Sequence, residues 1–404
     1  MLRHIDTLWD AFFPQQLCYP LQLIGDADHP ITTPKELEME LQKQYNIFTY
    51  RSDFEGISTN TGFVVHSDQG WGCLLRTSQM LLAHFLHRYG RPSDFSLRLF
   101  VDESTDAAPF SIHNMIKSVW DDKTFCAEYW SPSQACETVR KTMENAVKGG
   151  ALGTKFSVVC SSNGCLFSED VEQPLRGDTE VVLLLTPVRV SAVSRLTQET
   201  YLELENLMCQ PECLGVVGGV PGRSYYFFGH NQTQMAYLDP HQRVQPALTS
   251  LSSASTVPTL ADARSVHWSR VDTSLFLAFA VRDAAEWSHL KGKLSTKFLR
   301  IEAPRGTGVY RPQSHHTYRT GGRASPLCAP ALLLASSAKA RSQRIRPCSS
   351  GTEEPNNRKR LSDSTNGYIV SDARINLTGT VPKTDKEVDL DDTWDRLSEL
   401  EKSV

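Results

Sequence analysis

Apolar positions between residues 35 and 301 recur at two different periods, which predict helices in some segments and strands in others. In residues 74–86 the apolar side chains fall on one face at a spacing near 3.6 residues, as expected of a helix that packs against a core. Residues 133–146 show the same spacing, and Ser133 is a candidate N-cap for that helix. Two amphipathic helices are therefore expected.

A continuous apolar run at residues 181–185 predicts a strand that is covered on both faces and ends before Pro187. Shorter apolar runs, separated by turns rich in glycine, proline and asparagine, predict four more strands at residues 214–217, 225–228, 235–238 and 275–281. Such short turns favour hairpins. The pattern therefore predicts an α+β fold with a central, largely antiparallel sheet flanked by helices.

The composition changes after residue 302, where serine, arginine, proline, glycine and asparagine replace the apolar runs. Residues 303–380 contain more basic than acidic side chains and too few apolar ones to form a core, so we expect a disordered, basic linker. The last segment, residues 381–404, is acidic around a single aromatic residue, Trp394. The predicted organisation is an N-terminal segment 1–34, a folded domain 35–302, this linker and an acidic tail.

The charge of the chain gives little reason to expect a nucleic-acid partner, since the formal net charge is -4. The N-terminus has no apolar stretch of signal-peptide length and no segment reaches the length of a membrane span, which predicts a cytoplasmic protein. The cysteines, irregularly spaced, are then expected as reduced thiols. The pairs Cys160 with Cys165 and Cys209 with Cys213 lack the further ligands of a zinc site, so neither a metal nor a cofactor is predicted.

One cysteine stands directly after a glycine-rich turn, in the sequence DQGWGCLLR at residues 68–76. Cys73 would begin the helix predicted there, and the unpaired N–H groups at a helix N-terminus favour thiolate over thiol. Cys73 is thus a candidate nucleophile. The alternative is that it is a small buried apolar side chain, as free cysteines often are.

A cysteine nucleophile needs an imidazole base that is held by a third group. Among the histidines, His84 and His87 lie on the helix after the cysteine, where surface positions are expected. His241 follows a predicted strand in the sequence YLDPH at residues 237–241, and the extended geometry before the proline projects Asp239 and His241 to the same side. A strand-end turn with a solvated histidine is the alternative.

Together, these two motifs resemble those of the autophagin family, the autophagy-related cysteine proteases with a papain-like fold. The resemblance extends to FTYR, LGVVGGVP, YYFFG and VDTSL, at residues 48–51, 214–221, 225–229 and 271–275. Several motifs in the family's order are a more specific signal than any one of them. The resemblance implies a papain-like cysteine protease domain in residues 35–302.

By this resemblance Cys73 corresponds to the nucleophile, His241 to the general base and then acid, and Asp239 to the residue that orients the histidine. Tyr50 corresponds to the tyrosine whose hydroxyl helps to stabilise the oxyanion, and its alternative is a role as a core tyrosine. The resemblance therefore implies a thiol-dependent peptidase with four catalytic residues.

The resemblance also implies a groove for the substrate tail and a loop that closes it. Trp71, Tyr129 and Trp130 are the expected groove residues. The family pattern has a tryptophan where this chain has Tyr129, so Trp130 is the alternative aromatic wall. The gate corresponds to GVPG at residues 219–222. Pro221 would cover the cleft, and the glycines on both sides of the turn would act as hinges.

The implied substrate is a ubiquitin-like autophagy modifier (GABARAP-like), cleaved after its C-terminal glycine as a precursor and released from phosphatidylethanolamine as a lipid conjugate. The protein would then act in autophagosome formation and modifier recycling, and would contact the autophagosomal membrane only through its substrate. In the acidic tail, Trp394 and Leu397 stand three residues apart, which is typical of a modifier-interacting motif. An amphipathic helix is the alternative for the tail. The alternative function is a non-catalytic, modifier-binding scaffold.

Overall fold

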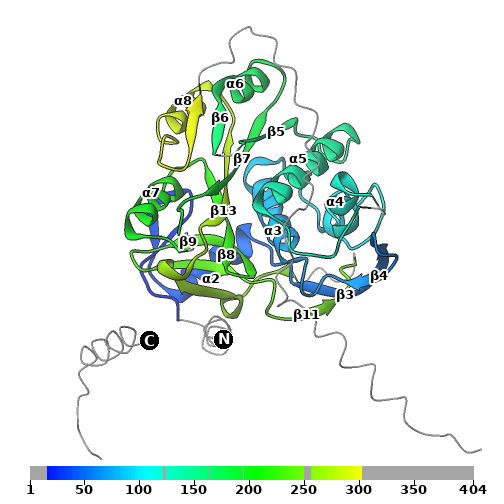
Figure 1. Cartoon of the computed structure of the whole chain (residues 1–404). Helices are drawn as coiled ribbons and strands as arrows, with labels where there is room; N and C mark the ends of the chain where they lie inside the picture. Colours follow the sequence, from blue (N-terminus) through cyan, green and yellow to red (C-terminus); the bar gives the residue numbers. More distant parts are fainter. Residues whose placement is uncertain (1–15, 122–123, 163, 194, 250–255, 303–404) are drawn as a thin grey trace, which may run out of the picture. The chain divides into compact units, whose positions relative to one another are not determined.

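The computed structural model describes residues 16–302, except 122–123, 163, 194 and 250–255 (Figure 1). These residues all belong to the first of two units into which the chain divides, Met1–Gln313 and Ser314–Val404. The predicted linker, 303–380, and the predicted acidic tail with Trp394 and Leu397 lie outside the described residues. The fold below is therefore that of the first unit.

A nine-stranded sheet forms the centre of the described residues. Its main path follows the order β12 (Ala263–His267), β10 (Gln234–Leu238), β9 (Arg223–His230), β8 (Cys213–Val220), β13 (Ser274–Val281), β7 (Val181–Arg189) and β5 (Phe156–Cys160). Off this path, β1 (Leu21–Leu23) pairs with β9 and with β2 (Asp26–Ile31). Neighbours on the main path are antiparallel except β5 and β7, which are parallel. The predicted α+β class with a largely antiparallel sheet is confirmed.

Strand β7 runs further than the sequence pattern predicts. Its residues are buried as far as Val188, which confirms a strand covered on both faces, but Pro187 lies inside the strand rather than after it. Pairing with β5 ends at Leu185, whereas pairing with β13 continues past Pro187. Because one side of β7 is already free of a neighbouring strand at that point, the missing N–H of proline breaks no ladder. The predicted strand end was therefore wrong.

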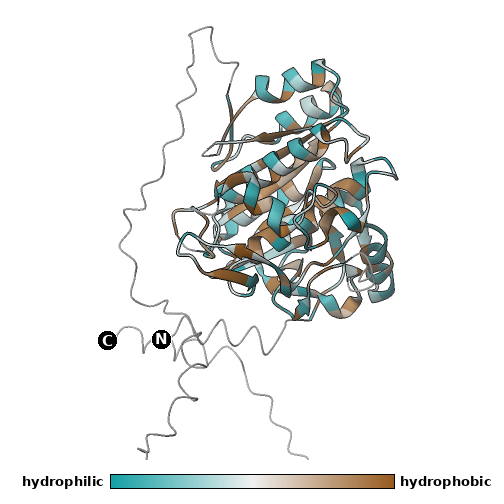
Figure 2. Ribbon diagram, turned by 90° about the vertical axis from the view of Figure 1, so that its right-hand side faces the viewer, coloured by the Kyte–Doolittle hydropathy of each residue, from teal (hydrophilic) through white to brown (hydrophobic). Residues whose placement is uncertain are grey.

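Helices cover both faces of the sheet. On one face α3 (Cys73–Tyr89) and α5 (Pro132–Lys148) pack into a single core with α2 (Pro34–Gln44) and α4 (Ile112–Val119). On the other face lies a second core that contains α6 (Ser168–Arg176), α7 (Gln198–Met208) and α8 (Ala284–Lys291). Figure 1 shows α3, α4 and α5 on one side of the sheet and α6, α7 and α8 on the other, and Figure 2 shows the apolar segments concentrated along the strands.

Smaller elements complete the unit. A three-stranded sheet contains β11 (Val244–Pro246), β3 (Tyr50–Ser58) and β4 (Val64–Ser67), and a two-stranded sheet contains β14 (Arg300–Glu302) and β6 (Cys165–Phe167). The described residues also include the short 3-10 helices η1 (Leu97–Phe100), η3 (Leu260–Asp262) and η4 (Trp268–Arg270). The three-stranded sheet matters for function, because it joins the start of β3 to the chain just after β10.

Both predicted helices are present, but the cap of the second differs from the prediction. The N-cap of α5 is Ser131 rather than Ser133. Ser131 Oγ accepts the Gln134 N–H at 3.3 Å, and the Gln134 side chain accepts the Ser131 N–H at 2.9 Å, which forms a capping box. Pro132 then occupies the first helical position, where its missing N–H costs nothing.

Helix α3 is buried on all sides along Cys73–Leu86 rather than on one face. His84 is 1% exposed, and its Nδ1 lies 2.7 Å from the Tyr226 hydroxyl and 3.1 Å from the Leu214 carbonyl oxygen. Burial lowers the pKa of His84 to about 3, so the ring is neutral. The predicted surface position of His84 was wrong, because α3 lies between the sheet and α5. His87 is exposed, as expected.

Candidate active site

The turn that precedes Cys73 is shaped by two glycines. Gly70 has a φ of 89°, a conformation that few other residues adopt. At Gly72, the N-cap of α3, a Cβ atom would lie 2.6 Å from Asp68 Cβ. The Gly72 N–H donates to the Asp68 carbonyl oxygen at 2.8 Å, which closes the turn. Cys73 is thereby the first residue of α3, as predicted, and its side chain is next to the free N–H groups of the helix.

Buried charges hold this turn against the helix. Arg76 Nε lies 2.6 Å from Asp68 Oδ2, and Arg76 Nη1 lies 2.9 Å from Asp102 Oδ1. All three side chains are inaccessible to solvent. Burial alone would lower the pKa of Arg76, but the carboxylates of Asp102 and Asp68 outweigh it and keep the pKa above its usual value. These two ion pairs therefore hold the loop before Cys73 against the first turn of α3.

A second buried arginine, Arg51, belongs to the same cluster. Its backbone N–H donates to Asp68 Oδ1 at 2.6 Å, and its Nη1 donates to the Pro246 carbonyl oxygen at 3.2 Å. Nε and Nη2 of Arg51 have no hydrogen-bond partner among the described residues. Burial and the neighbouring Arg76 charge lower the pKa of Arg51 to about 10. The cluster joins β3, β11 and α3, the elements around the candidate site.

The candidate base lies just after β10. His241 Nδ1 donates to Asp239 Oδ1 at 2.6 Å, and the His241 backbone N–H donates to the same oxygen at 2.8 Å. Asp239 is 2% exposed, so its carboxylate is held away from water. Burial disfavours a charged imidazole, but the contacts with Asp239 and Cys73 outweigh it and raise the pKa of His241 above its usual value. The two side chains thus lie on the same side, as the extended backbone before the proline predicts.

The second ring nitrogen of His241 is the one available to Cys73. Because Nδ1 is engaged by Asp239, Nε2 is the nitrogen left for the thiol, and it is buried without a hydrogen bond of standard geometry among the described residues. The Cys73 side chain is nevertheless close enough to contribute to the raised pKa of His241. Such contacts in an empty site commonly tighten when substrate enters. The arrangement can transfer a proton from sulfur to nitrogen.

Tyr50 lies beside both groups. Its backbone N–H donates to the Pro240 carbonyl oxygen at 3.0 Å, and its ring meets the His241 ring edge-on at 5.1 Å between centroids. Burial and the Cys73 thiol raise the pKa of Tyr50, so its hydroxyl stays protonated and can donate a hydrogen bond. The structure therefore brings Cys73 and Tyr50, from the first part of the domain, together with Asp239 and His241, which lie more than 160 residues further along the chain.

A cavity of about 350 Å³ opens over the thiol. Its lining residues are Cys73, Leu74, Tyr129, Trp130, Pro132, Gly218, Gly219, Val220, Gly222, Arg223, Ser224, Asp272 and Ser274. Cys73 is itself 3% exposed, so the thiol is buried and yet borders the cavity. The sequence leaves two interpretations open for Cys73, a candidate nucleophile and a small buried side chain. A buried thiol that borders a cavity is compatible with both.

A family comparison is decisive at this point. The sequence model of the peptidase C54 catalytic domain matches residues 35–293. This range includes Cys73, His241, Asp239 and Tyr50. The chain belongs to the peptidase C54 family of cysteine proteases.

Curated relatives of this peptidase C54 chain are autophagy-related proteases. A probable cysteine protease ATG4 from Meyerozyma guilliermondii is 27% identical over 329 residues, which cover 72% of this chain and 77% of the relative. One from Debaryomyces hansenii is 34% identical over 209 residues, which cover 47% of this chain and 41% of the relative. The cysteine protease atg-4.2 of Caenorhabditis elegans is 29% identical over 224 residues, which cover 48% of this chain and 41% of the relative.

The predicted groove residues of this C54 protease lie in different surroundings. Tyr129 is 61% exposed and Trp130 is half-buried, and both line the cavity. Trp71 is buried; its Nε1 donates to the Ser67 carbonyl oxygen at 3.0 Å and its ring packs edge-on against Phe125. Two of the three expected aromatic residues, Tyr129 and Trp130, therefore line the cavity. Trp71 is buried instead and stabilises the turn before Cys73.

The predicted gate is the tight turn between β8 and β9. Pro221 is exposed at its tip, and Gly222 has a φ of 82°. At Gly219 a Cβ atom would lie 2.0 Å from the Arg223 carbonyl oxygen, so the hairpin closes only without a side chain there. The residues on either side of Pro221 line the cavity, but Pro221 itself does not.

Sequence reasoning assigned no role to several residues of the site. Arg51, Arg76 and Asp102 form the buried cluster, and Arg223 and Asp272 are the charged residues that line the cavity. Arg76 closes the DQGWGCLLR motif and Arg223 comes two residues after Pro221, so their places in the motifs were visible. Their contacts depend on partners distant in sequence.

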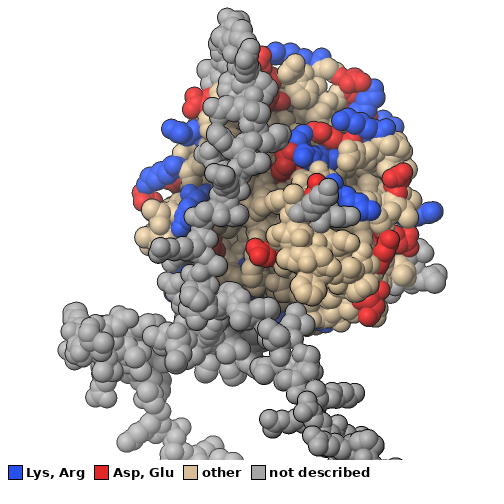
Figure 3. Space-filling view, turned by 45° about the vertical axis from the view of Figure 1, so that its right-hand side comes forward, with Lys and Arg blue, Asp and Glu red and all other residues tan. Residues whose placement is uncertain are grey.

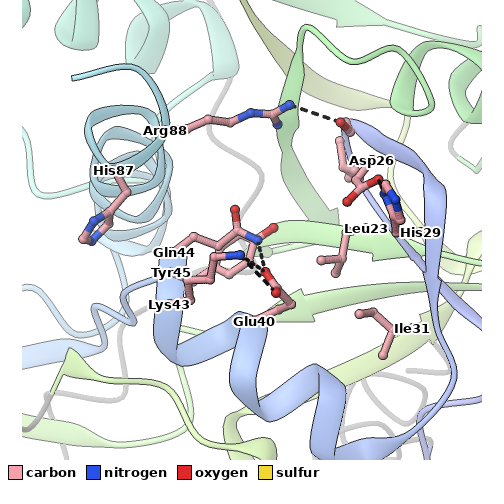
Figure 4. Close-up of a pocket in the computed structure, with 12 residues that line it drawn as sticks. Leu23, Asp26, His29, Ile31, Glu40, Lys43, Gln44, Tyr45, His87 and Arg88 are labelled. Carbon is pink, nitrogen blue, oxygen red and sulfur yellow. Dashed lines mark hydrogen bonds and ion pairs between the residues drawn. The ribbon is translucent and has the colours of Figure 1, made fainter. Parts of the chain in front are cut away.

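A second cavity, of about 570 Å³, lies away from Cys73, between the β1–β2 hairpin, α2 and the end of α3 (Figure 4). Its polar side chains pair with one another: His29 with Asp26 at 2.9 Å, and Lys43 with Glu40 at 3.2 Å. No cysteine or serine lines it. It therefore contains no second cysteine that could compete with Cys73.

Charged side chains and possible metal ligands are spread over the described residues. On the face shown in Figure 3, basic and acidic side chains are interspersed rather than gathered by sign. In the described part of the chain, no group of three or more histidine, cysteine and acidic residues is arranged to hold a metal ion. None of the helices in that part is long and apolar enough to cross a membrane.

Proposed function

We propose that this C54 protease cleaves a ubiquitin-like autophagy modifier after its C-terminal glycine, both in the precursor and in the conjugate with phosphatidylethanolamine. The observation that carries the proposal is the contact of Cys73 with a histidine whose other nitrogen is held by Asp239 at 2.6 Å. A scaffold that only binds the modifier has no use for such an arrangement. The autophagy-related proteases among the curated relatives support the same substrate class.

The reaction begins when His241 Nε2 takes the proton of Cys73 and the sulfur attacks the carbonyl carbon of the modifier's C-terminal glycine. The Tyr50 hydroxyl and the free N–H groups at the start of α3 stabilise the negative oxygen that forms. His241 then gives its proton to the leaving nitrogen, which departs as an amine and leaves a thioester on Cys73. Water, deprotonated by the same imidazole, hydrolyses the thioester and restores the thiol.

The walls of the cavity would account for the choice of glycine. Tyr129, Trp130 and the glycine-rich end of β8 border it next to the thiol. A residue with a side chain at the cleavage point would have to displace one of these walls, whereas glycine needs no such space. The exposed turn at Pro221 is placed to move when the modifier's tail enters.

The proposal extends to partners and location. The modifier would be the main partner, and the enzyme would meet the autophagosomal membrane only through the lipid-linked modifier, acting in the cytoplasm. The tail residues Trp394 and Leu397, which lie outside the described residues, would bind a second surface of the modifier and hold it near the site.

Incubation of the purified protein with a modifier precursor that has a C-terminal extension tests the proposal. Mass spectrometry should show the extension removed after glycine by the wild type and by Cys18→Ala, a control at an exposed cysteine, but not by Cys73→Ala. The Cys73→Ala protein should still bind the modifier, since only the covalent step is lost. Binding without any cleavage by the wild type would favour the scaffold and refute the protease.

A further inference from the structure

Arg223 is the positively charged side chain of the cavity over Cys73. It begins β9, directly after the gate turn, and it is half-buried. The cavity's remaining charged lining residue, Asp272, accepts the Ser274 backbone N–H at 2.8 Å. The mechanism above assigns Arg223 no role, because neither proton transfer nor oxyanion stabilisation uses it.

The contacts of Arg223 keep it charged without neutralising it. Tyr225 and the Asp239 carboxylate lie near enough to affect its pKa, but among the described residues no carboxylate forms an ion pair with it. Burial would lower the pKa of Arg223, but Tyr225 and Asp239 outweigh it and raise the pKa. The cation nearest to Asp239 Oδ2 is instead Arg264, at 3.9 Å. Arg223 therefore keeps a half-buried charge that can bind an anion.

Tyr225 fixes the side of the cavity on which this charge lies. Its ring stacks on Tyr237 with centroids 4.1 Å apart and meets the His241 ring edge-on at 6.0 Å. Because Arg223 is near Tyr225, it lies on the side of the cavity close to His241. His241 must reach the leaving nitrogen to protonate it, so the leaving group lies on that side as well.

We propose that Arg223 binds the phosphodiester of the lipid headgroup in the conjugated substrate and so favours cleavage of the conjugate. The inference rests on the proposed function. In an amide of phosphoethanolamine the phosphate follows the scissile nitrogen after two carbons and one oxygen, so an anion lies close to the reacting bond. The fork of N–H donors on a guanidinium matches two phosphate oxygens at once. A peptide extension has no such anion at this distance.

Two soluble substrates without a membrane test the proposal with the full-length protein. In one the modifier's C-terminal glycine is amide-linked to phosphoethanolamine, and in the other to ethanolamine. The ratio of their kcat/KM values should favour the phosphorylated leaving group in the wild type. Arg223→Gln should lower that ratio about tenfold, because the neutral amide loses the charged hydrogen bonds to the phosphate. Arg223→Lys should retain part of it, and Arg176→Gln, on the exposed face of α6, should retain all of it.

The result separates this inference from the proposed function. If the wild type cleaves neither substrate, the proposed function fails. If the wild type cleaves both and Arg223→Gln leaves the ratio unchanged, Arg223 does not bind the phosphate. That conclusion holds whether or not both rates fall. A loss that appears only with conjugates in anionic vesicles, and not with the soluble pair, would also overturn the inference, because Arg223 would then respond to the bilayer charge.

Discussion

Arg76 Nε lies 2.6 Å from Asp68 Oδ2, and both side chains are fully buried beneath the turn that precedes Cys73. The same carboxylate accepts the Arg51 backbone N–H, so Asp68 joins β3 to the first turn of α3. A buried ion pair adds little when compared with an apolar pair, but removing one member leaves a charge without compensation. The position of the nucleophile therefore depends on the integrity of this cluster.

Arg76→Met should lower the free energy of unfolding by about 3–5 kcal/mol, because Asp68 and Asp102 lose their buried partner. The matched control is Arg140→Met on α5. Arg140 also meets two carboxylates, those of Glu137 and Glu144, but all three side chains are partly exposed to water, so its loss should cost less than about 1 kcal/mol. Urea unfolding of both variants measures the difference. Equal effects would show that the buried cluster does not hold the turn.

Gly72→Ala should reduce kcat far more than it changes KM. The added Cβ would meet Asp68 Cβ at 2.6 Å, so the turn must shift and Cys73 must move with it. Gly292→Ala is a suitable control, because its Cβ would meet its nearest neighbour at an ordinary 3.6 Å. Steady-state kinetics on a modifier precursor give both constants. A Gly72→Ala enzyme with wild-type kcat would contradict the need for close approach in this turn.

Asp239→Asn should lower turnover on the order of 10³-fold, because the amide no longer selects the tautomer that leaves Nε2 free. It should also lower the pKa of His241, since the Asp239 carboxylate helps to raise it in the wild type. NMR of the His241 ring as a function of pH gives the midpoint in each protein. A midpoint that stays the same or rises in Asp239→Asn would assign the raised pKa to another group.

The same raised pKa predicts how stability depends on pH. A histidine whose pKa is higher in the folded than in the unfolded state stabilises the fold below its unfolded value, about 6.5, and this stabilisation is lost as the pH rises through the folded value. The stability difference between wild type and Asp239→Asn should therefore shrink as the pH rises past 6.5. Urea unfolding between about pH 5.5 and 8 measures it, and a difference that grows with pH would reverse the assigned sign.

Replacing Trp394 and Leu397 together with alanine should weaken binding of the modifier and raise KM, while kcat stays near that of the wild type. The tail would act by keeping the substrate at a high local concentration rather than by chemistry. Leu361→Ala with Tyr368→Ala, in the preceding segment, is the control. Titration calorimetry measures the affinity. Unchanged affinity in the tail variant would remove the tether and favour an amphipathic helix.

Local patterns in the sequence predict much of the fold. The apolar runs of β8, β9, β10 and β13 and the spacing in α3 reflect burial of neighbouring residues, which periodicity records directly. The N-cap of α5 was misplaced by two residues, because Ser131 and Ser133 both flank Pro132 and only the reciprocal bonds with Gln134 distinguish them. Helix α3 shows the limit of periodicity. Because it is buried on all sides, its polar residues are buried as well and do not mark a solvent-exposed face.

Predicting the site needed more than local pattern. The candidates Cys73 and His241 stand in recognisable turns, and the family resemblance adds Tyr50. The buried contacts of Arg76 with Asp102, and the place of Arg223 beside the cavity, depend on segments that only the folded chain brings together. A charged side chain usually lies at the surface, so sequence alone favours that position for each arginine.

The most direct test of the central claim uses the modifier with an electrophile in place of its scissile carbonyl. The wild-type protein should gain the mass of one modifier, and peptide mapping should place the bond on Cys73. His241→Ala should form the adduct far more slowly, and Cys73→Ala should form none. An adduct on another cysteine, or one that persists in Cys73→Ala, would contradict the assignment of Cys73 as the nucleophile.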